Sequence, residues 1–416
     1  MPPQFRCLWK QEAMQMQRVI IIGAGAAGML CAGEILRRRP GTDVTILEAG
    51  RKPLAKVAVT GGGRCNLTNS FEGIRSLSEA YPRGERAMKR ALMAFGVDDT
   101  LGWFRERGVK MTLQEDHCWF PVSQDAMEIV DTLRRNASGA RILLNTRAMK
   151  IERQEAGFRV LCQDGKVFEA DVTVVTAGGM SKSSGMLDGL GITTEPPVPS
   201  LFTFKINDPI KSLMGLVIEN ASVCIPGTRF RAGGPLLITD WGFSGPAVLK
   251  LSSYAARFLN ENEYRSPVSV NWLDMNDSQA RELLLSLSGA NLQKMVSSVH
   301  PDGIPSRLWS YISAKTGLSE RRWAEIGKNG MNRLCQCLVN DGYAIEGRAK
   351  FKEEFVTCGG VSLGEVEWYS FEAKKVPGLF FAGEILDIDA ITGGFNLQAA
   401  WSTGWCAAKG IVEKYG

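Results

Sequence analysis

The sequence predicts an α/β fold in which one parallel sheet is built from both ends of the chain. Two glycine-rich segments carry this prediction. The first, over 23–28, reads Gly-Ala-Gly-Ala-Ala-Gly and follows the β-branched run 18–22. The second, over 383–394, follows the apolar run 379–381. A buried parallel strand that stops at a glycine turn is typical of a Rossmann-like nucleotide-binding domain. The sequence therefore predicts a discontinuous domain of this kind, with the remaining elements inserted between its halves.

The first βαβ unit contains the residues that a dinucleotide needs. The strand over 18–22 leads into a helix over 26–39, and a second strand over 44–47 ends at Glu48. In Gly-x-Gly-x-x-Gly, the first glycine makes the turn, the second admits the pyrophosphate, and the third lets helix and strand pack. Glu48 lies 48 − 28 = 20 residues past the last glycine, where a carboxylate takes the ribose hydroxyls.

The remaining elements follow from periodicity and turn signals. Helices are expected over 85–95, 99–107 and 397–413, and from an N-cap at Ser123. Strands are expected over 142–144, 148–153, 158–162, 167–170 and 172–176. Short strands dominate 201–272, interrupted by a helix that opens at Pro246, and 277–339 is helical. Extended structure returns over 345–357.

These patterns predict four parts of the chain. They are a disordered leader (1–17), a nucleotide-binding domain (18–199 and 356–416), an inserted β-rich domain (200–275 and 341–355) and a helical insert (276–340). The composition change at 195–199, Glu-Pro-Pro-Val-Pro, marks the first boundary.

Composition narrows the class of protein. Of 416 residues, 44% are hydrophobic and 22% charged, with a net charge of +5, which is typical of a soluble globular protein and is weak evidence for a nucleic-acid partner. Ten cysteines without regular spacing and only two histidines predict reduced thiols and no metal site. No apolar run resembles a signal peptide or a membrane span, so we expect a cytoplasmic protein.

A second glycine loop follows the βαβ unit. Residues 60–69 read Thr-Gly-Gly-Gly-Arg-Cys-Asn-Leu-Thr-Asn. Three glycines let backbone run close to a flat ligand, and Arg64 and Asn66 add donors suited to phosphate or to carbonyl oxygens. We interpret this loop as a cofactor loop in preference to a surface turn.

At this point the chain resembles a known family, the BaiN/YhiN-like NAD(P)/FAD-dependent oxidoreductases, which include aminoacetone-oxidase-like FAD-binding flavoproteins. The matching segments lie at 23–28, 61–69, 120–123, 241–246, 357–361 and 378–394. The resemblance implies non-covalent FAD in a discontinuous domain of the glutathione-reductase type, with an inserted β-rich domain and a helical subdomain. The activities it implies vary between reduction of activated C=C bonds in steroid-like substrates and oxidation of small amino ketones.

The resemblance also implies which residues hold FAD. Around the ADP half it places Gly23, Gly25, Ala26, Ala27, Gly28, Glu48, Ala49 and Ala148, and beneath the cofactor Ala177, Gly178 and Gly179. Near the flavin and the middle of the cofactor it places Lys56, Thr60, Gly62, Gly63, Arg64, Cys65 and Asn66. It assigns Gly383, Glu384 and Asp389 to the ribityl chain and pyrophosphate. The isoalloxazine N1/O2 edge is assigned to Gly393, Gly394, Asn396 and Leu397, where a helix N-terminus stabilises negative charge on the reduced ring.

These features predict an FAD-dependent oxidoreductase that exchanges hydride between flavin N5 and a small or mid-sized organic substrate. The chain has no second Gly-x-Gly-x-x-Gly and no Cys-x-x-Cys, so NAD(P)H is expected only as a transient electron donor. An oxidase of amines or amino ketones that uses dioxygen is an alternative. So is an RNA-associated or redox-sensing flavoprotein, although a nucleic-acid partner is disfavoured. The basic residues behind the RNA alternative are Arg281, Lys294, Arg307, Lys315, Arg321, Arg322 and Lys328.

No catalytic residue is assigned from the sequence. His117 and Cys65 are weak candidates for an acid/base and a redox thiol, and a polar loop histidine and a packed thiol are the competing interpretations. Trp241, Phe243 and Phe395 either line a substrate pocket or belong to the core.

Overall fold

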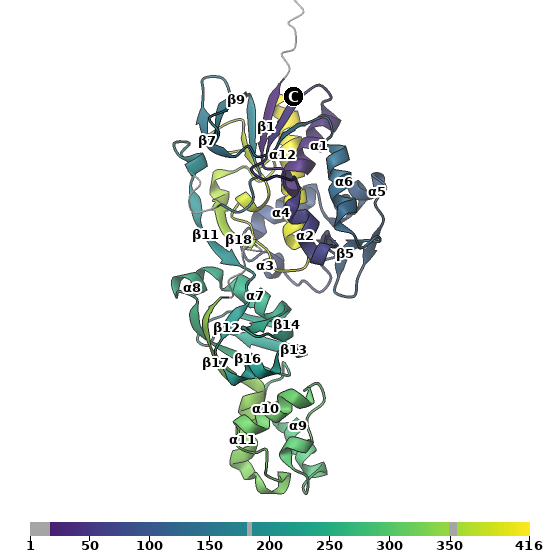
Figure 1. The fold of residues 1–416 in the computed structure, drawn as a ribbon, viewed down its shortest axis with the longest axis vertical. Helices are drawn as coiled ribbons and strands as arrows, with labels where there is room; N and C mark the ends of the chain where they lie inside the picture. The colour runs from purple at the N-terminus through teal and green to yellow at the C-terminus, as the bar shows by residue number, and fades with distance from the viewer. Residues whose placement is uncertain (1–16, 181–184, 349–355) are drawn as a thin grey trace, which may run out of the picture.

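The computed structural model describes residues 17–180, 185–348 and 356–416, arranged as three units along the long axis (Figure 1). The sheet unit comprises 17–180 and 356–416, the barrel unit 204–271 and 341–348, and the helical unit 272–340. Residues 1–16 of the predicted leader lie outside the described residues. Residues 349–355 of the predicted extended segment lie outside them too. The predicted domain boundaries stay a prediction.

The core of the sheet unit is a five-stranded parallel sheet of order β19-β10-β1-β2-β6. Its strands are β1 (Arg18–Ile22), β2 (Asp43–Leu47), β6 (Arg141–Leu143), β10 (Val172–Val175) and β19 (Leu379–Phe381). Helices α1 (Ala26–Arg38) and α12 (Phe395–Tyr415) pack against each other and share one hydrophobic core with the sheet. This arrangement confirms the predicted α/β class and Rossmann-like domain built from both chain ends.

Two small antiparallel sheets and several helices complete the sheet unit. One sheet contains β7 (Ala148–Arg153), β8 (Phe158–Cys162) and β9 (Val167–Ala170), and the other β3 (Thr68–Asn69), β5 (Cys118–Pro121) and β4 (Met111–Leu113). The helices are α2 (Ala55–Gly63), α3 (Leu77–Ala80), α4 (Glu85–Ala94), α5 (Val97–Glu106) and α6 (Ala126–Asn136). The predicted cap at Ser123 is wrong, because the Asp125 side chain accepts the N–H of Met127 at 2.8 Å and α6 begins there.

The barrel unit is closed by six antiparallel strands in the order β12-β15-β14-β13-β16-β17. They are β12 (Phe204–Ile206), β13 (Val217–Cys224), β14 (Arg231–Ile238), β15 (Gly242–Ser244), β16 (Arg265–Asn271) and β17 (Asp341–Arg348). Helices α7 (Pro246–Tyr254) and α8 (Ala256–Glu261) lie where the barrel meets the sheet unit (Figure 1). The antiparallel pair β11 (Thr194–Ser200) and β18 (Val356–Val361) connects the two units.

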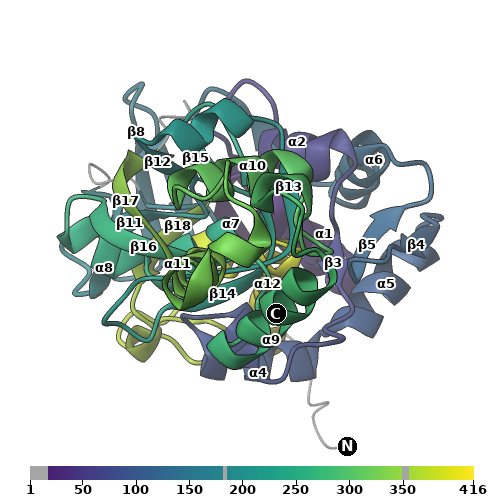
Figure 2. The ribbon, with the colours of Figure 1, turned by 90° about the horizontal axis from the view of Figure 1, so that it is seen from below.

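The helical unit is an insertion between two neighbouring barrel strands. It contains α9 (Asp277–Ala290), α10 (Ser306–Lys315) and α11 (Gly327–Val339), and the view from below shows these helices in front of the barrel (Figure 2). Short 3-10 turns occur at η1 (Gly185–Leu187), η2 (Pro209–Leu213), η3 (Val296–Ser298), η4 (Trp323–Glu325), η5 (Leu363–Glu365) and η6 (Gly383–Ile385). Buried Asp341 of β17 joins the units, since it accepts Trp272 Nε1 at 3.1 Å and Lys315 Nζ at 2.6 Å.

Candidate cofactor-binding site

The glycine turn after β1 is closely packed at Gly23 and Gly28. Gly23 has φ +111° and donates its N–H to Leu47 O at 2.8 Å. Thr176 Oγ1 donates to the carbonyls of Ile22 and Gly23, at 3.0 and 2.8 Å. A Cβ at Gly28 would lie 2.1 Å from Gly23 O, which explains why the third position must be glycine.

The N-terminus of α1 is open. Its N-cap, Gly25, makes no side-chain cap, and a Cβ there would meet nothing within 4 Å. The first helical bond is donated by Met29 N to Gly25 O at 3.0 Å, so the N–H groups of Ala26, Ala27 and Gly28 have no partner inside this fully described helix. Open N–H groups at the positive end of a helix dipole suit a diphosphate.

Glu48, the predicted ribose-binding acid, is fixed beside this turn. Its Oε2 accepts the N–H of Ala24 at 2.8 Å, and its Oε1 accepts that of Gly50 at 2.6 Å. Two backbone donors orient the carboxylate and leave its other lone pairs available for hydroxyl groups. Ala49, the next residue, is exposed.

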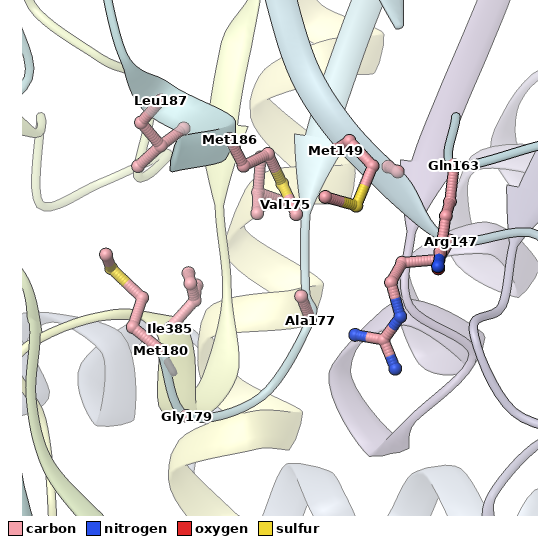
Figure 3. Close-up of a pocket in the computed structure, with 11 residues that line it drawn as sticks. Arg147, Met149, Gln163, Val175, Ala177, Gly179, Met180, Met186, Leu187 and Ile385 are labelled. Atoms are coloured by element: carbon pink, nitrogen blue, oxygen red, sulfur yellow. The ribbon is translucent and has the colours of Figure 1, made fainter. Parts of the chain in front are cut away.

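A cavity of about 410 Å³ lies at the carboxyl end of β10, where Val175 lines it (Figure 3). Its lining includes three of the predicted cofactor residues, Ala148, Ala177 and Gly179. Arg147 and Gln163 line it too, and no motif in the sequence marks either of them. The cavity lies close to Glu48. Thr146, which precedes the lining residue Arg147, donates its N–H to Glu48 O at 2.8 Å. A cavity in this position suits the adenine end of a dinucleotide, as the resemblance implies for Ala148.

The second glycine loop ends a helix that the sequence analysis did not predict. Near the end of α2 the backbone leaves the helical conformation at Thr60, Gly61 and Gly62. Both glycines have positive φ. A Cβ at Gly62 or Gly63 would meet nothing within 4 Å, so the backbone there is open to a ligand. The Arg64 guanidinium lies 4.4 Å from the ring centre of Phe120.

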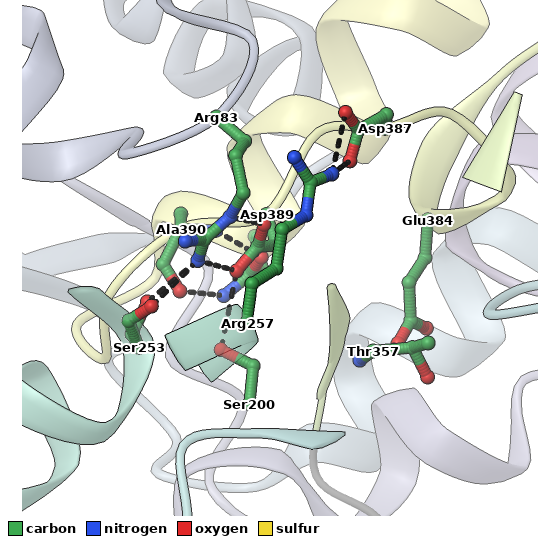
Figure 4. Close-up of polar contacts among 10 residues, drawn as sticks. Arg83, Ser200, Ser253, Arg257, Thr357, Glu384, Asp387, Asp389 and Ala390 are labelled. Atoms are coloured by element: carbon green, nitrogen blue, oxygen red, sulfur yellow. Dashed lines mark hydrogen bonds and ion pairs between the residues drawn. The ribbon is translucent and has the colours of Figure 1, made fainter. Parts of the chain in front are cut away.

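Glu384 connects three predicted segments. Its Oε2 lies 3.2 Å from Lys56 Nζ, and its Oε1 accepts Thr357 N at 2.8 Å. Figure 4 shows Glu384 and Thr357 side by side. Its two carboxylate oxygens also lie 3.6 and 3.2 Å from the Cβ positions of Gly178 and Gly179. Gly383, the preceding residue, lies close to the glycine turn after β1, because a Cβ at Gly383 would be 3.1 Å from Ala27 Cβ.

The N-terminus of α12 is a second open helix end. Its N-cap, Gly394, has φ +88°, and the first helical bond is donated by Gln398, so the N–H groups of Asn396 and Leu397 have no partner inside this fully described helix. The Asn396 side chain bonds Ala390 N and O, both at 3.0 Å, and fixes the preceding loop. Asn69, which the sequence analysis did not select, donates to Gly393 O at 3.1 Å.

Asn66 provides the test of whether these residues fit FAD. Its Oδ1 is buried and has no hydrogen-bond partner among the described residues, and it lies 2.6 Å from where a Cβ of Gly394 would be. A buried acceptor without a partner is costly, and a flavin ring N–H is a donor that can satisfy it. With the open helix ends and Glu48, this orphaned oxygen shows that the site fits FAD.

Asp389 is an exception among the predicted residues. It is fully buried, its two oxygens bond the Arg83 guanidinium, and Ser200 Oγ donates to it at 3.1 Å (Figure 4). Arg83 also donates to Ser253 O of α7 at 2.8 Å. Asp389 therefore fits a structural role at the junction of the sheet and barrel units better than direct contact with the cofactor.

The weak catalytic candidates lie in different environments. Cys65 is fully buried, and burial raises the pKa of its thiol to about 12. His117 is half-exposed, with Nδ1 3.5 Å from Glu72 Oε2. Among the aromatics, Phe243 belongs to the barrel core, Phe395 packs edge-on against Phe71, and Trp241 is half-exposed.

Within 17–180, 185–348 and 356–416, no group of three His, Cys, Asp or Glu residues is arranged to hold a metal ion. None of the helices in these ranges combines the length and apolar character needed to cross a bilayer.

The fold and the site define a nucleotide-binding protein of the Rossmann type whose open loops suit FAD. The family described as the HI0933-like protein Rossmann domain matches residues 17–410, and the chain belongs to it. This confirms the resemblance noted from the motifs and places the chain among FAD-binding oxidoreductases.

Named relatives cover almost the whole chain. The 3-dehydro-bile acid delta(4,6)-reductase of Clostridium scindens is 30% identical over 419 residues, covering 96% of this chain and 100% of its own. The ribosomal RNA dihydrouridine synthase of Escherichia coli is 28% identical over 416 residues, covering 96% and 99%. The protein of the same name from Haemophilus influenzae is 27% identical over 417 residues, covering 96% and 100%.

Proposed function

We propose that this protein is an FAD-dependent reductase of carbon–carbon double bonds conjugated to a carbonyl group. The observation that carries the proposal is the pair of open helix N-termini of α1 and α12, together with the orphaned oxygen of Asn66 beside Gly394. FAD, when bound, supplies hydride chemistry at N5. The N–H groups of Ala26, Ala27 and Gly28 bind the diphosphate, and Glu48 binds the ribose.

The chain's own residues hold the redox end of the cofactor. The α12 N-terminus, with the N–H groups of Asn396 and Leu397, stabilises negative charge at the N1/O2 edge. Asn66 accepts a ring N–H, and Asn69 fixes Gly393. Glu384 and Lys56 border the middle of the cofactor.

The reaction type is supported by the relatives' names. A dihydrouridine synthase and a delta(4,6)-reductase of a 3-dehydro compound both saturate C=C bonds conjugated to a carbonyl. We extend this shared chemistry to the present chain, with NAD(P)H as transient electron donor. An oxidase of amines or amino ketones is the competing activity.

An anaerobic spectrum separates these activities. Purified holoprotein is mixed with NADH or NADPH, then with an enone, and in a parallel sample with air. Bleaching by NAD(P)H, fast recovery with the enone and slow recovery in air support the reductase. Fast recovery in air with peroxide formation, or no bleaching by NAD(P)H, contradicts it. Tight binding of NAD(P)H to FAD-free protein contradicts transient docking.

A second candidate is reduction of a uracil base in ribosomal RNA. It is favoured by two relatives of that name, each matching 96% of this chain. These names weaken the expectation that no nucleic acid is involved, which rested on modest net charge. Mass spectrometry of rRNA from cells with and without the gene tests it. Loss of dihydrouridine, restored by the wild-type gene, supports RNA as the substrate; unchanged rRNA leaves a small molecule as the proposed substrate.

A further inference from the structure

Lys250 lies on the face of α7 that meets the sheet unit. One turn further along this helix, Tyr254 OH donates to Glu79 O at 3.0 Å. Residues four apart lie on the same helix face, so Lys250 and Tyr254 are turned the same way. Ser253 beside them accepts Arg83, which fixes α7 against the sheet unit. Figure 1 shows α7 and α3 next to each other at this junction.

The Lys250 side chain is half-buried without a partner. It makes no hydrogen bond or ion pair with any residue in the described ranges, and its Nζ lies 4.0 Å from the Cβ position of Gly234 in β14. Burial lowers the pKa of this amine, and the carboxylate of Glu79 on α3 partly offsets the effect. An ammonium group removed from water and left unpaired is costly, which is tolerated where a ligand completes its environment.

The same junction contains the start of α12. Ile391 N donates to Ala80 O at 3.0 Å, and Tyr81 OH donates to Phe395 O at 3.0 Å. Residues 79–81 thus contact α7 and the first turn of α12. In Figure 1 the C-terminus of α12 lies at the end of the sheet unit far from the barrel, so its N-terminal turn is directed toward the barrel. Lys250 is a cation of the barrel unit near this junction that has no partner among the described residues.

We infer that Lys250 touches the substrate and gives the proton that completes its reduction, an inference that rests on the proposed function. Hydride, with its electron pair derived from a reduced nicotinamide, forms a C–H bond at one carbon of the conjugated double bond. The π electrons move toward the carbonyl oxygen. The Lys250 ammonium transfers a proton to the other carbon, the carbonyl re-forms, and the neutral amine regains a proton from water.

The test compares acceptors that do and do not need a proton. Photoreduced holoenzyme is mixed anaerobically with cyclohex-2-enone or with ferricyanide. Lys250→Met is expected to slow reoxidation by the enone about 100-fold or more and to leave reoxidation by ferricyanide unchanged. Lys250→Arg retains the charge but is a much weaker acid, so it gives only slight recovery. Lys89→Met, at an exposed lysine on α4, is the matched control and should behave as wild type.

Two results of this kinetic experiment overturn the inference. One is enone reoxidation of Lys250→Met at the wild-type rate. The other is equal slowing with both acceptors, because the side chain then supports the cofactor or the fold.

The location of Lys250 is tested without turnover. Lysines are methylated reductively with ¹³C, and the Lys250 signal is identified by its absence in Lys250→Arg. It should titrate below the exposed lysines and shift when the flavin is reduced, whereas the Lys89 signal should not shift. A Lys250 signal insensitive to flavin reduction overturns the inference. If wild type is inert toward the enone while this signal responds, the proposed reductase activity fails and the position of Lys250 at the flavin stands.

Discussion

Asp389 and Arg83, 306 residues apart, form a buried ion pair where the sheet unit meets the barrel. Ser200 of β11 donates to the same carboxylate, and the guanidinium donates to Ser253 O. Nearby, Arg257 of α8 pairs with Asp387 at 2.8 Å (Figure 4). The loop that leads into α12 is therefore held on both sides, by its own unit and by the barrel.

Breaking this pair should destabilise the protein strongly. Arg83→Met or Asp389→Leu leaves one buried charge unpaired, which costs about 3–5 kcal/mol of unfolding free energy, and the double variant should cost less than the sum. Urea unfolding of all four proteins measures the cycle. Glu152→Gln, which breaks the more exposed pair with Lys150, should cost under about 1 kcal/mol. Additive single effects would show that the pair is not coupled.

Gly25→Ala should separate cofactor binding from folding. A Cβ at this position meets no protein atom within 4 Å, and Gly25 has φ −85°, so the apoprotein tolerates the methyl group. The same methyl group occupies the space that the pyrophosphate needs, so FAD affinity should fall at least about 10-fold. Gly102→Ala in α5, also without neighbours, serves as the control for stability. Titration of apoprotein with FAD gives the affinity, and unchanged binding would remove the pyrophosphate from this turn.

Glu34 should make stability depend on acid pH. It is fully buried and accepts Trp103 Nε1 and Arg37 Nη2, both at 2.8 Å. Burial alone would raise the pKa of Glu34, but hydrogen bonds from Arg37 and Trp103 outweigh it and hold the pKa below the usual 4.5. The folded-state pKa is thus lower than the unfolded one. Its stabilising contribution is present above about pH 4.5 and is lost as the pH falls through the folded-state value.

Thermal unfolding across pH checks this expectation. Glu34→Gln should lower the melting temperature at pH 7 and flatten the decline between about pH 5 and pH 3. The control, Glu155→Gln at an exposed position, should leave the profile unchanged. An unaltered acid limb in Glu34→Gln would assign the acid sensitivity to other carboxylates.

Cys65 should be chemically inert in the folded protein. Burial raises the pKa of the Cys65 thiol to about 12, so the thiol is protonated at pH 7, and the side chain is fully buried. Cys65→Ala should leave the rate of flavin reduction by NAD(P)H unchanged, and an aromatic disulfide reagent should label Cys65 only after unfolding. Rapid labelling of Cys65 in the native protein would restore the redox-thiol hypothesis.

The sequence predicted those elements whose signal is local. A β-branched run before glycine identified β1, and an apolar run before Gly383 identified β19, so the parallel sheet followed from two short segments. Helix α2 was missed because the glycines at its end, which have positive φ, were interpreted from the sequence as part of a loop. The closure of the barrel was also missed, since alternating residues reveal a strand but not its neighbours.

The candidate site divides in the same way. Gly25 and Glu48 belong to a motif whose spacing along the chain can be read directly from the sequence. The resemblance assigned Asp389 to the cofactor, but its partner Arg83 stands far away in the chain and nothing near either residue in the sequence indicates the pair. Lys250 was overlooked for the related reason that its lack of a partner exists only in the folded protein.

The helical unit enters and leaves the barrel at paired positions. Val270 of β16 lies opposite Asp341 of β17, so residues 272–340 occupy the place of a hairpin loop between adjacent strands. Because the entry and exit points are neighbours, an insertion of this length leaves the six-stranded barrel closed, although the two units share one hydrophobic core.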